Sequence, residues 1–112
     1  MTLDLNEVRQ PRDSRFLSGR PSGELARRHF NLDRLDTDKV EINDVQIPED
    51  VYAMNLSFFL GMFGPSIRKW GKDGFREHYT FPAKDVHRRI IEEGISRAVA
   101  EGTIFEAVAK HG

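Results

Sequence analysis

The clearest hydrophobic pattern covers residues 55–70. Its apolar positions recur at steps of three and four: Leu56, Phe59, Leu60, Phe63, Ile67 and Trp70. This spacing predicts a helix with one side facing the core. Phe58 and Met62 fall on a neighbouring face, so we expect more than one side of the helix to be covered. Pro65 removes one helical hydrogen bond, which predicts a bend near Gly64.

A second helical pattern follows Pro82. Its apolar positions are Val86, Ile90, Ile91, Ile95, Ala98 and Val99. We expect this helix to end at Gly102 and residues 103–112 to form a tail that can fray. A shorter helix is predicted from a cap at Ser22 to about Leu32. Its expected inward side consists of Leu25, His29 or Phe30, and Leu32.

Alternating apolar and polar residues predict the strands. The best of them is residues 39–47 (KVEINDVQI), and residues 75–81 (FREHYTF) and 2–8 give weaker patterns. Between residues 9 and 23 the chain is rich in Pro, Gly, Ser and Arg, which is typical of a loop, with a short extended piece around Phe16 and Leu17. Strands that alternate with helices predict one α/β domain over residues 1–112, with a small mixed sheet packed against two or three helices.

Composition narrows the function classes. The 112 residues include no cysteine, which excludes disulfides and thiolate chemistry and fits a cytoplasmic protein. No apolar run is long enough to span a membrane, so we expect no membrane partner. The net charge of −1 gives no overall attraction to nucleic acid. Residues 1–35 nevertheless hold seven arginines, no lysine and five acidic residues, which indicates either solvated faces or an arginine patch that docks a partner.

Catalytic chemistry finds no support in the sequence. The four histidines are not spaced as a helical metal pair, and the serines include no nucleophile motif. We therefore predict no catalytic residue, no metal and no cofactor. One loop offers a candidate anion site at Arg20, Ser22 and Gly23, because a glycine-containing loop before a helix can present free amides to phosphate. The alternative is that this loop only starts a helix.

The region from Val40 to Phe81 resembles the STAS-like group of small bacterial proteins, relatives of the anti-sigma-factor-antagonist domain. The resemblance is carried by a strand (VEINDV), an irregular piece, a helix (SFFLGMFGPSIRKWG) and a strand (FREHYTF), with SGRPSGELARRHF as an earlier helix. It implies a STAS-like sandwich and a regulatory role. In the antagonist relatives a partner kinase phosphorylates a serine at the start of this helix, and Ser57 matches that position.

The resulting hypothesis is a non-enzymatic interaction module whose partner is a histidine-kinase-like ATPase. Its candidate partner-binding residues are Tyr52, Met54, Asn55, Phe58 and Met62, and Ser57 is the candidate phosphoacceptor. Exposure of these apolar side chains would support it, because contiguous apolar surface marks interfaces. Three alternatives remain open: Ser57 only caps or begins the helix, the chain binds a small anion at Arg20–Gly23, or it forms a homodimer over the Phe58/Met62 face.

Overall fold

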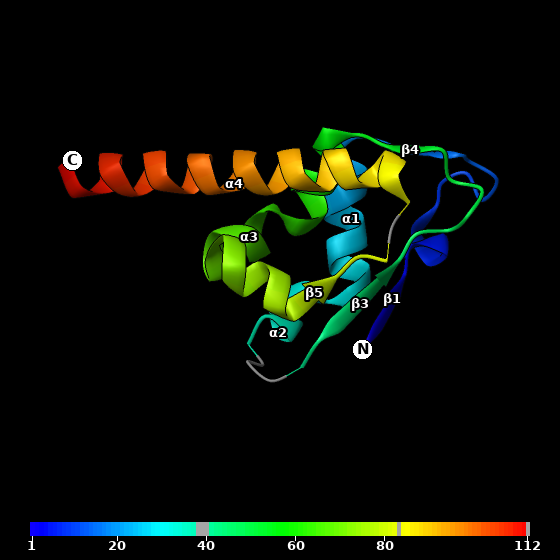
Figure 1. Ribbon diagram of the computed structural model, residues 1–112, viewed down its shortest axis with the longest axis horizontal. Helices are drawn as coiled ribbons and strands as arrows, with labels where there is room; N and C mark the ends of the chain where they lie inside the picture. The colour runs from blue at the N-terminus through cyan, green and yellow to red at the C-terminus, as the bar shows by residue number, and fades with distance from the viewer. Residues whose placement is uncertain (38–40, 83, 112) are drawn as a thin grey trace.

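The computed structural model describes the backbone of residues 1–37, 41–82 and 84–111 and, within these ranges, the side chains up to Gly102 (Figure 1). Its elements in chain order are β1 (Thr2–Asp4), the 3-10 helix η1 (Leu5–Val8), β2 (Phe16–Leu17), α1 (Arg20–Phe30), α2 (Leu32–Leu35), β3 (Asn43–Gln46), β4 (Ala53–Met54), α3 (Leu56–His78), β5 (Tyr79–Thr80) and α4 (Asp85–His111). The predicted α/β class is confirmed. Long helices pack against short strands, and α4 reaches beyond the rest of the molecule (Figure 1).

All strand pairings in the described part of the chain are parallel. One sheet has the order β1-β3-β5, with Leu3 opposite Val45 and Asn43 opposite Tyr79, and β2 pairs with β4 in a second sheet. The sheet is therefore parallel where we expected a mixed one. Each pair of neighbouring strands is separated in sequence by at least one helix, and such a crossover brings the chain back to the same end of the sheet.

Helix α3 is longer than the pattern predicted. It continues to His78, so only Tyr79 and Thr80 of the expected strand at residues 75–81 are extended. The helix breaks at Gly71, beyond the predicted bend near Gly64, and the φ of 76° at Gly71 lies in the left-handed region that glycine tolerates. After this break the helix resumes and buries Phe75 against the ring of Phe63, with 5.8 Å between centroids.

Other element boundaries also differ from the sequence pattern. The first strand ends at Asp4, and the strand expected at 39–47 forms only over Asn43–Gln46. Its positions 39 and 40 lie outside the described residues. The extended piece at Phe16 and Leu17 is confirmed as β2. Helix α4 passes through Gly102 without ending, because one helical glycine costs only about 1 kcal/mol.

The predicted inward side of α1 is confirmed at Phe30 and Leu32 and wrong at Leu25. The helix begins after Gly19, not Ser22, and its C-terminal cap is Asn31. Its buried residues are Gly23, Ala26, Arg27 and Phe30, whereas Leu25 is 51% exposed. The small residues face α3 because the two helices cross closely: a Cβ on Gly23 would lie 2.2 Å from the carbonyl oxygen of Phe58. A larger side chain would not fit at this crossing.

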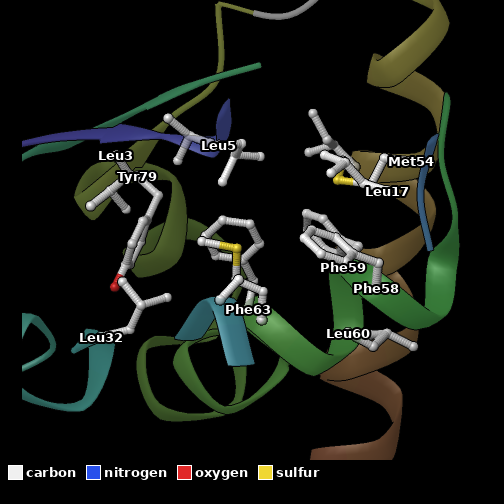
Figure 2. Close-up of a cluster of buried hydrophobic side chains, with 14 of the residues drawn as sticks. Leu3, Leu5, Leu17, Leu32, Met54, Phe58, Phe59, Leu60, Phe63 and Tyr79 are labelled. Atoms are coloured by element: carbon white, nitrogen blue, oxygen red, sulfur yellow. The ribbon is translucent and has the colours of Figure 1, made fainter. Parts of the chain in front are cut away.

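The core is built around α3. Its fully buried rings include Phe58, Phe59 and Phe63, which meet side chains from the strands and from α1 and α4. Figure 2 shows Leu17 and Met54, which are paired residues of β2 and β4, next to the rings of Phe58 and Phe59. The predicted wide apolar arc of this helix is thus covered on several sides.

Candidate functional site

The residues predicted to bind a partner do not form one surface. Met54, Phe58 and Met62 are at most 2% exposed and belong to the core. They cannot contact a partner in the folded chain. The predicted homodimer over Phe58 and Met62 is wrong for the same reason, because neither side chain is on the surface. These residues are apolar because several elements pack around α3 and bury them.

Asn55 has a structural task. Its Oδ1 accepts a hydrogen bond from the backbone N–H of Phe58 at 2.9 Å and another from the N–H of Gly19 at 3.3 Å. The first bond caps α3, and the second ties the start of α3 to the start of α1. The side chain therefore connects two helix N-termini.

Ser57 lies exposed in the first turn of α3. It does not cap the helix, because Asn55 does so. A hydroxyl at this position is open to solvent and near the positive end of the helix dipole, where a phosphate would be tolerated. The structure is compatible with Ser57 as a phosphoacceptor, which stays a prediction.

Tyr52 is exposed and held by Arg15. The guanidinium lies 5.1 Å from the ring centroid, and Arg15 Nη1 donates a hydrogen bond to the phenol oxygen at 2.6 Å. The backbone N–H of Tyr52 also donates to the carbonyl of Arg15. These contacts present an ordered aromatic and cationic pair beside β2.

The candidate anion site at Arg20, Ser22 and Gly23 is not assembled. Gly23 packs against α3, Arg20 lines a groove between α1 and α3, and Ser22 lines a different groove beside β2. Successive helical positions point in different directions, so three such close residues diverge. We therefore assign no joint site to them.

A groove beside β2, which we call the apolar groove after Phe16 and Leu25 in its lining, lies near these residues and has a mixed polar and apolar lining. It lies between α1 on one side and η1 and β2 on the other, with a volume of about 230 Å³. Its lining includes the buried side chains of Leu17, Ala26 and Phe58 and the exposed side chains of Phe16 and Leu25. Here the ring of Phe16 is 59% exposed, so two large apolar side chains from separate elements meet solvent in one groove.

Polar groups also border the apolar groove. His29 Nε2 lies 3.1 Å from Glu7 Oε1 and links α1 to η1. The exposure of Phe16 and Leu25 was not predicted from the sequence. Gly23 and Ala26 lie three positions apart in the sequence, and two small residues at this spacing could have indicated that another helix packs on their side of α1. Leu25 would then have been predicted to lie outside.

The arginines on and near α1 differ in their exposure. Arg20 and Arg28, which are exposed, line the groove toward α3 together with Arg68. Arg9, in contrast, is buried and donates through both terminal nitrogens to Asp50, which lowers the pKa of that carboxyl. The arginine-rich N-terminal region thus contains both structural and solvent-facing guanidinium groups.

A buried polar network connects α1, α2, α3 and β5. Asp36 Oδ2 accepts from Arg27 Nη2 at 3.1 Å and from Ser66 Oγ at 2.5 Å, and its Oδ1 accepts from the hydroxyl of Tyr79 at 2.6 Å. Arg27 also donates to the carbonyl of Met62. Burial, followed by the bond to Asp36, raises the pKa of Tyr79, so the phenol stays protonated. These groups satisfy one another in the interior and stabilise the packing of the layers.

Comparisons with known proteins found no match: no family model fits the chain, and no curated protein or solved structure is similar to it. Among the described residues, no cluster of three His, Cys, Asp or Glu side chains could hold a metal ion. No helix in the part of the chain that was searched is long and apolar enough to cross a membrane.

Proposed function

We propose that this chain is a non-enzymatic regulatory module that binds a protein partner in the apolar groove. The observation that carries the proposal is the joint exposure of Phe16 and Leu25 over a floor formed by Leu17, Ala26 and Phe58. Large apolar side chains left in water at one groove favour burial by a partner, and each would contribute about 1.5–3 kcal/mol if fully covered.

The charges around the groove indicate the chemistry of the partner. Glu7 and His29 line the groove itself, and Arg15 stands beside β2 with Tyr52, whereas the exposed Arg20 and Arg28 of α1 line the other groove, toward α3. Arginine and tyrosine are residues that often dominate binding energy at protein interfaces. A partner segment with an apolar anchor in the groove and an acidic side chain toward Arg15 would complement this surface.

The resemblance to the STAS-like group supports a more specific partner, a histidine-kinase-like ATPase. Exposed Ser57 would then be the residue that the kinase modifies. Phosphorylation would add about −1.5 to −2 charges in the first turn of α3. An acidic partner held by nearby arginines would be repelled by this charge, so modification would release it.

The test is capture of partners by the tagged full chain from its own cells, with and without ATP. Wild type is compared with Phe16→Glu and Leu25→Glu, and Ile42→Glu is the matched control because Ile42 is 58% exposed and lies outside the groove. We expect one protein to be lost with both groove variants and kept with the control. That protein is then purified, and its affinity for all four chains is measured by calorimetry.

Thermal unfolding confirms that the variants are folded, since exposed positions usually change stability by less than about 0.5 kcal/mol. A partner that binds the groove variants as well as wild type would refute the groove as its site. Ser57 is followed by mass spectrometry, with exposed Ser96 as the control serine. If Ser57→Ala leaves ATP-dependent release unchanged, the switch at Ser57 is wrong while the groove is judged separately.

A further inference from the structure

A second concave surface lies where the parallel strands β3 and β5 end. This strand-end groove is formed by residues at and after the carboxyl ends of both strands and by the start of α4, and it has a volume of about 440 Å³. Its polar lining includes Asp44, Gln46, Glu49, Lys84 and His87. In open α/β sheets, ligands characteristically bind beyond the carboxyl ends of parallel strands.

His87 is the unusual residue of the strand-end groove. It is only 2% exposed, yet its Nδ1 has no hydrogen-bond partner among the described residues. Burial lowers the pKa of the imidazole, and the charge of Lys84 adds to this effect. An interaction with the backbone of Val51 opposes the shift, and because Nδ1 has no partner we assign this interaction to Nε2 as the protonated nitrogen. The other ring nitrogen, Nδ1, then carries a lone pair that accepts nothing.

Lys84 supplies the cation of the groove. Its carbonyl accepts the backbone N–H groups of His87 at 2.9 Å and Arg88 at 3.3 Å, so Lys84 stands at the start of α4. Its ammonium donates to the carbonyl of Glu49 at 3.4 Å. An ammonium has three donors, so capacity remains for an anion, and the helix N-terminus adds to the attraction.

The carboxylate of Asp44 is already engaged and does not neutralise Lys84 directly. Its Oδ1 accepts from Thr80 Oγ1 at 3.0 Å and its Oδ2 accepts from Gln46 Nε2 at 2.6 Å. The lining of the strand-end groove therefore combines a cation with spare donors and a buried imidazole nitrogen without a partner, and it also contains the carboxylates of Asp44 and Glu49. A buried polar atom without a hydrogen-bond partner destabilises the fold, and a ligand that bonds to it binds more tightly because this free-energy cost is removed.

We propose that the strand-end groove binds a small molecule that carries a carboxylate or phosphate and, beside it, a hydroxyl or ammonium group. The anion lies on Lys84 and the first turn of α4, and the hydroxyl or ammonium donates to Nδ1 of His87. This site is distinct from the apolar groove and does not depend on the function proposed there.

The test is nuclear magnetic resonance of the full chain, with ¹⁵N-labelled histidine and backbone. Lactate, glycine and glycerol 3-phosphate each carry an anion and a donor, whereas acetate and inorganic phosphate lack the carbon-bound hydroxyl or ammonium. We expect saturable shifts at His87 and the first turn of α4. At least one probe with a hydroxyl or ammonium should bind about tenfold tighter than the simple anion of the same kind, acetate or phosphate. One hydrogen bond to a charged or buried group contributes enough free energy for this factor.

Two variants make the result specific. Lys84→Gln, at an exposed position, should weaken the best probe about tenfold, and Lys72→Gln, on α3, should leave it unchanged. His87→Gln should remove the preference for donor-bearing probes. If this variant does not fold, the ¹⁵N shifts of the His87 ring in the wild type report whether Nδ1 accepts a hydrogen bond. Absence of saturable shifts with every probe, or binding that ignores Lys84→Gln, would overturn the proposal. The carboxylate and phosphate arms show which source of anion the groove prefers.

Discussion

Replacement of Gly61 by alanine tests how closely α1 and α3 approach each other. A Cβ at Gly61 would lie 2.4 Å from the carbonyl oxygen of Arg20 and 3.2 Å from the backbone nitrogen of Glu24. The first distance is about 1 Å shorter than a normal contact. The atoms it meets belong to the backbone of α1, so they cannot rotate away, and the two helices must separate.

Two effects of opposite sign decide the outcome. Alanine is a better helix former than glycine by about 1 kcal/mol, whereas overpacking of a tight interior costs about 1–3 kcal/mol. Because the clash is with backbone, we expect its cost to lie at the upper end. Gly61→Ala should therefore lower the free energy of unfolding by about 1–2 kcal/mol.

Gly64→Ala is the matched control in the same helix. There the new Cβ would meet the Nη1 of Arg68 at 3.1 Å, and this is the far end of an exposed, flexible side chain that can move aside. The gain in helix propensity is then opposed only by the ring of Pro65, which disfavours a Cβ on the preceding helical residue, so we expect stabilisation by less than about 1 kcal/mol.

Urea denaturation followed by circular dichroism measures both variants, and each kcal/mol corresponds to about 4 °C in Tm for a domain of this size. The opposite signs are the test. If both variants are stabilised equally, α1 and α3 do not cross at Gly61 as closely as described.

Three further changes probe the interior, the pH dependence and the surface. Asp36→Ala removes the acceptor of Arg27, Ser66 and Tyr79. Arg27 keeps only the exposed Asp33 as a carboxylate partner, so urea denaturation should show a loss of about 3 kcal/mol, the lower end for a broken buried pair; a loss below about 1 kcal/mol would contradict burial of this network. Burial lowers the pKa of His87 in the folded chain, so as the pH falls below about 6.5 the imidazole is protonated in the unfolded chain first. The free energy of unfolding of the wild type should therefore fall by up to about 1.4 kcal/mol per pH unit from this group. His87→Gln should lack that part of the slope in denaturation curves between about pH 5.5 and 7.5, and an unchanged slope would show that His87 does not titrate differently on folding. Leu25→Ser should change the free energy of unfolding by less than about 0.5 kcal/mol, and a core-sized loss would place Leu25 inside after all.

The sequence predicted the features that local periodicity controls. The stripe from Leu56 to Ile67 identified the central helix, and the period of Val86 to Val99 identified α4. The short segment at residues 75–81 was misassigned because alternation over seven residues also fits a helix that buries Phe75 and His78 three positions apart.

Long-range contacts explain the remaining errors. Leu25 looked like an inward residue, but the crossing with α3 has Gly23 at its close approach, and Leu25 is left half exposed. Met54 and Phe58 looked like docking residues because nothing local shows that β2, α1 and α4 cover them. The strand-end groove joins His87 to Asp44, which is far away in sequence, so no local pattern could predict it.

The network around Asp36 also constrains how this chain can diverge. A change of Asp36 alone leaves Arg27 without its buried carboxylate, and a change of Arg27 alone leaves a buried carboxylate without its cation. Either intermediate loses a large part of the roughly 5–15 kcal/mol that stabilise a typical domain. A joint replacement of both residues by well-packed apolar ones can be neutral. Relatives of this protein should therefore keep residues 27 and 36 together or exchange them together, which gives a pairwise signature for finding distant homologues.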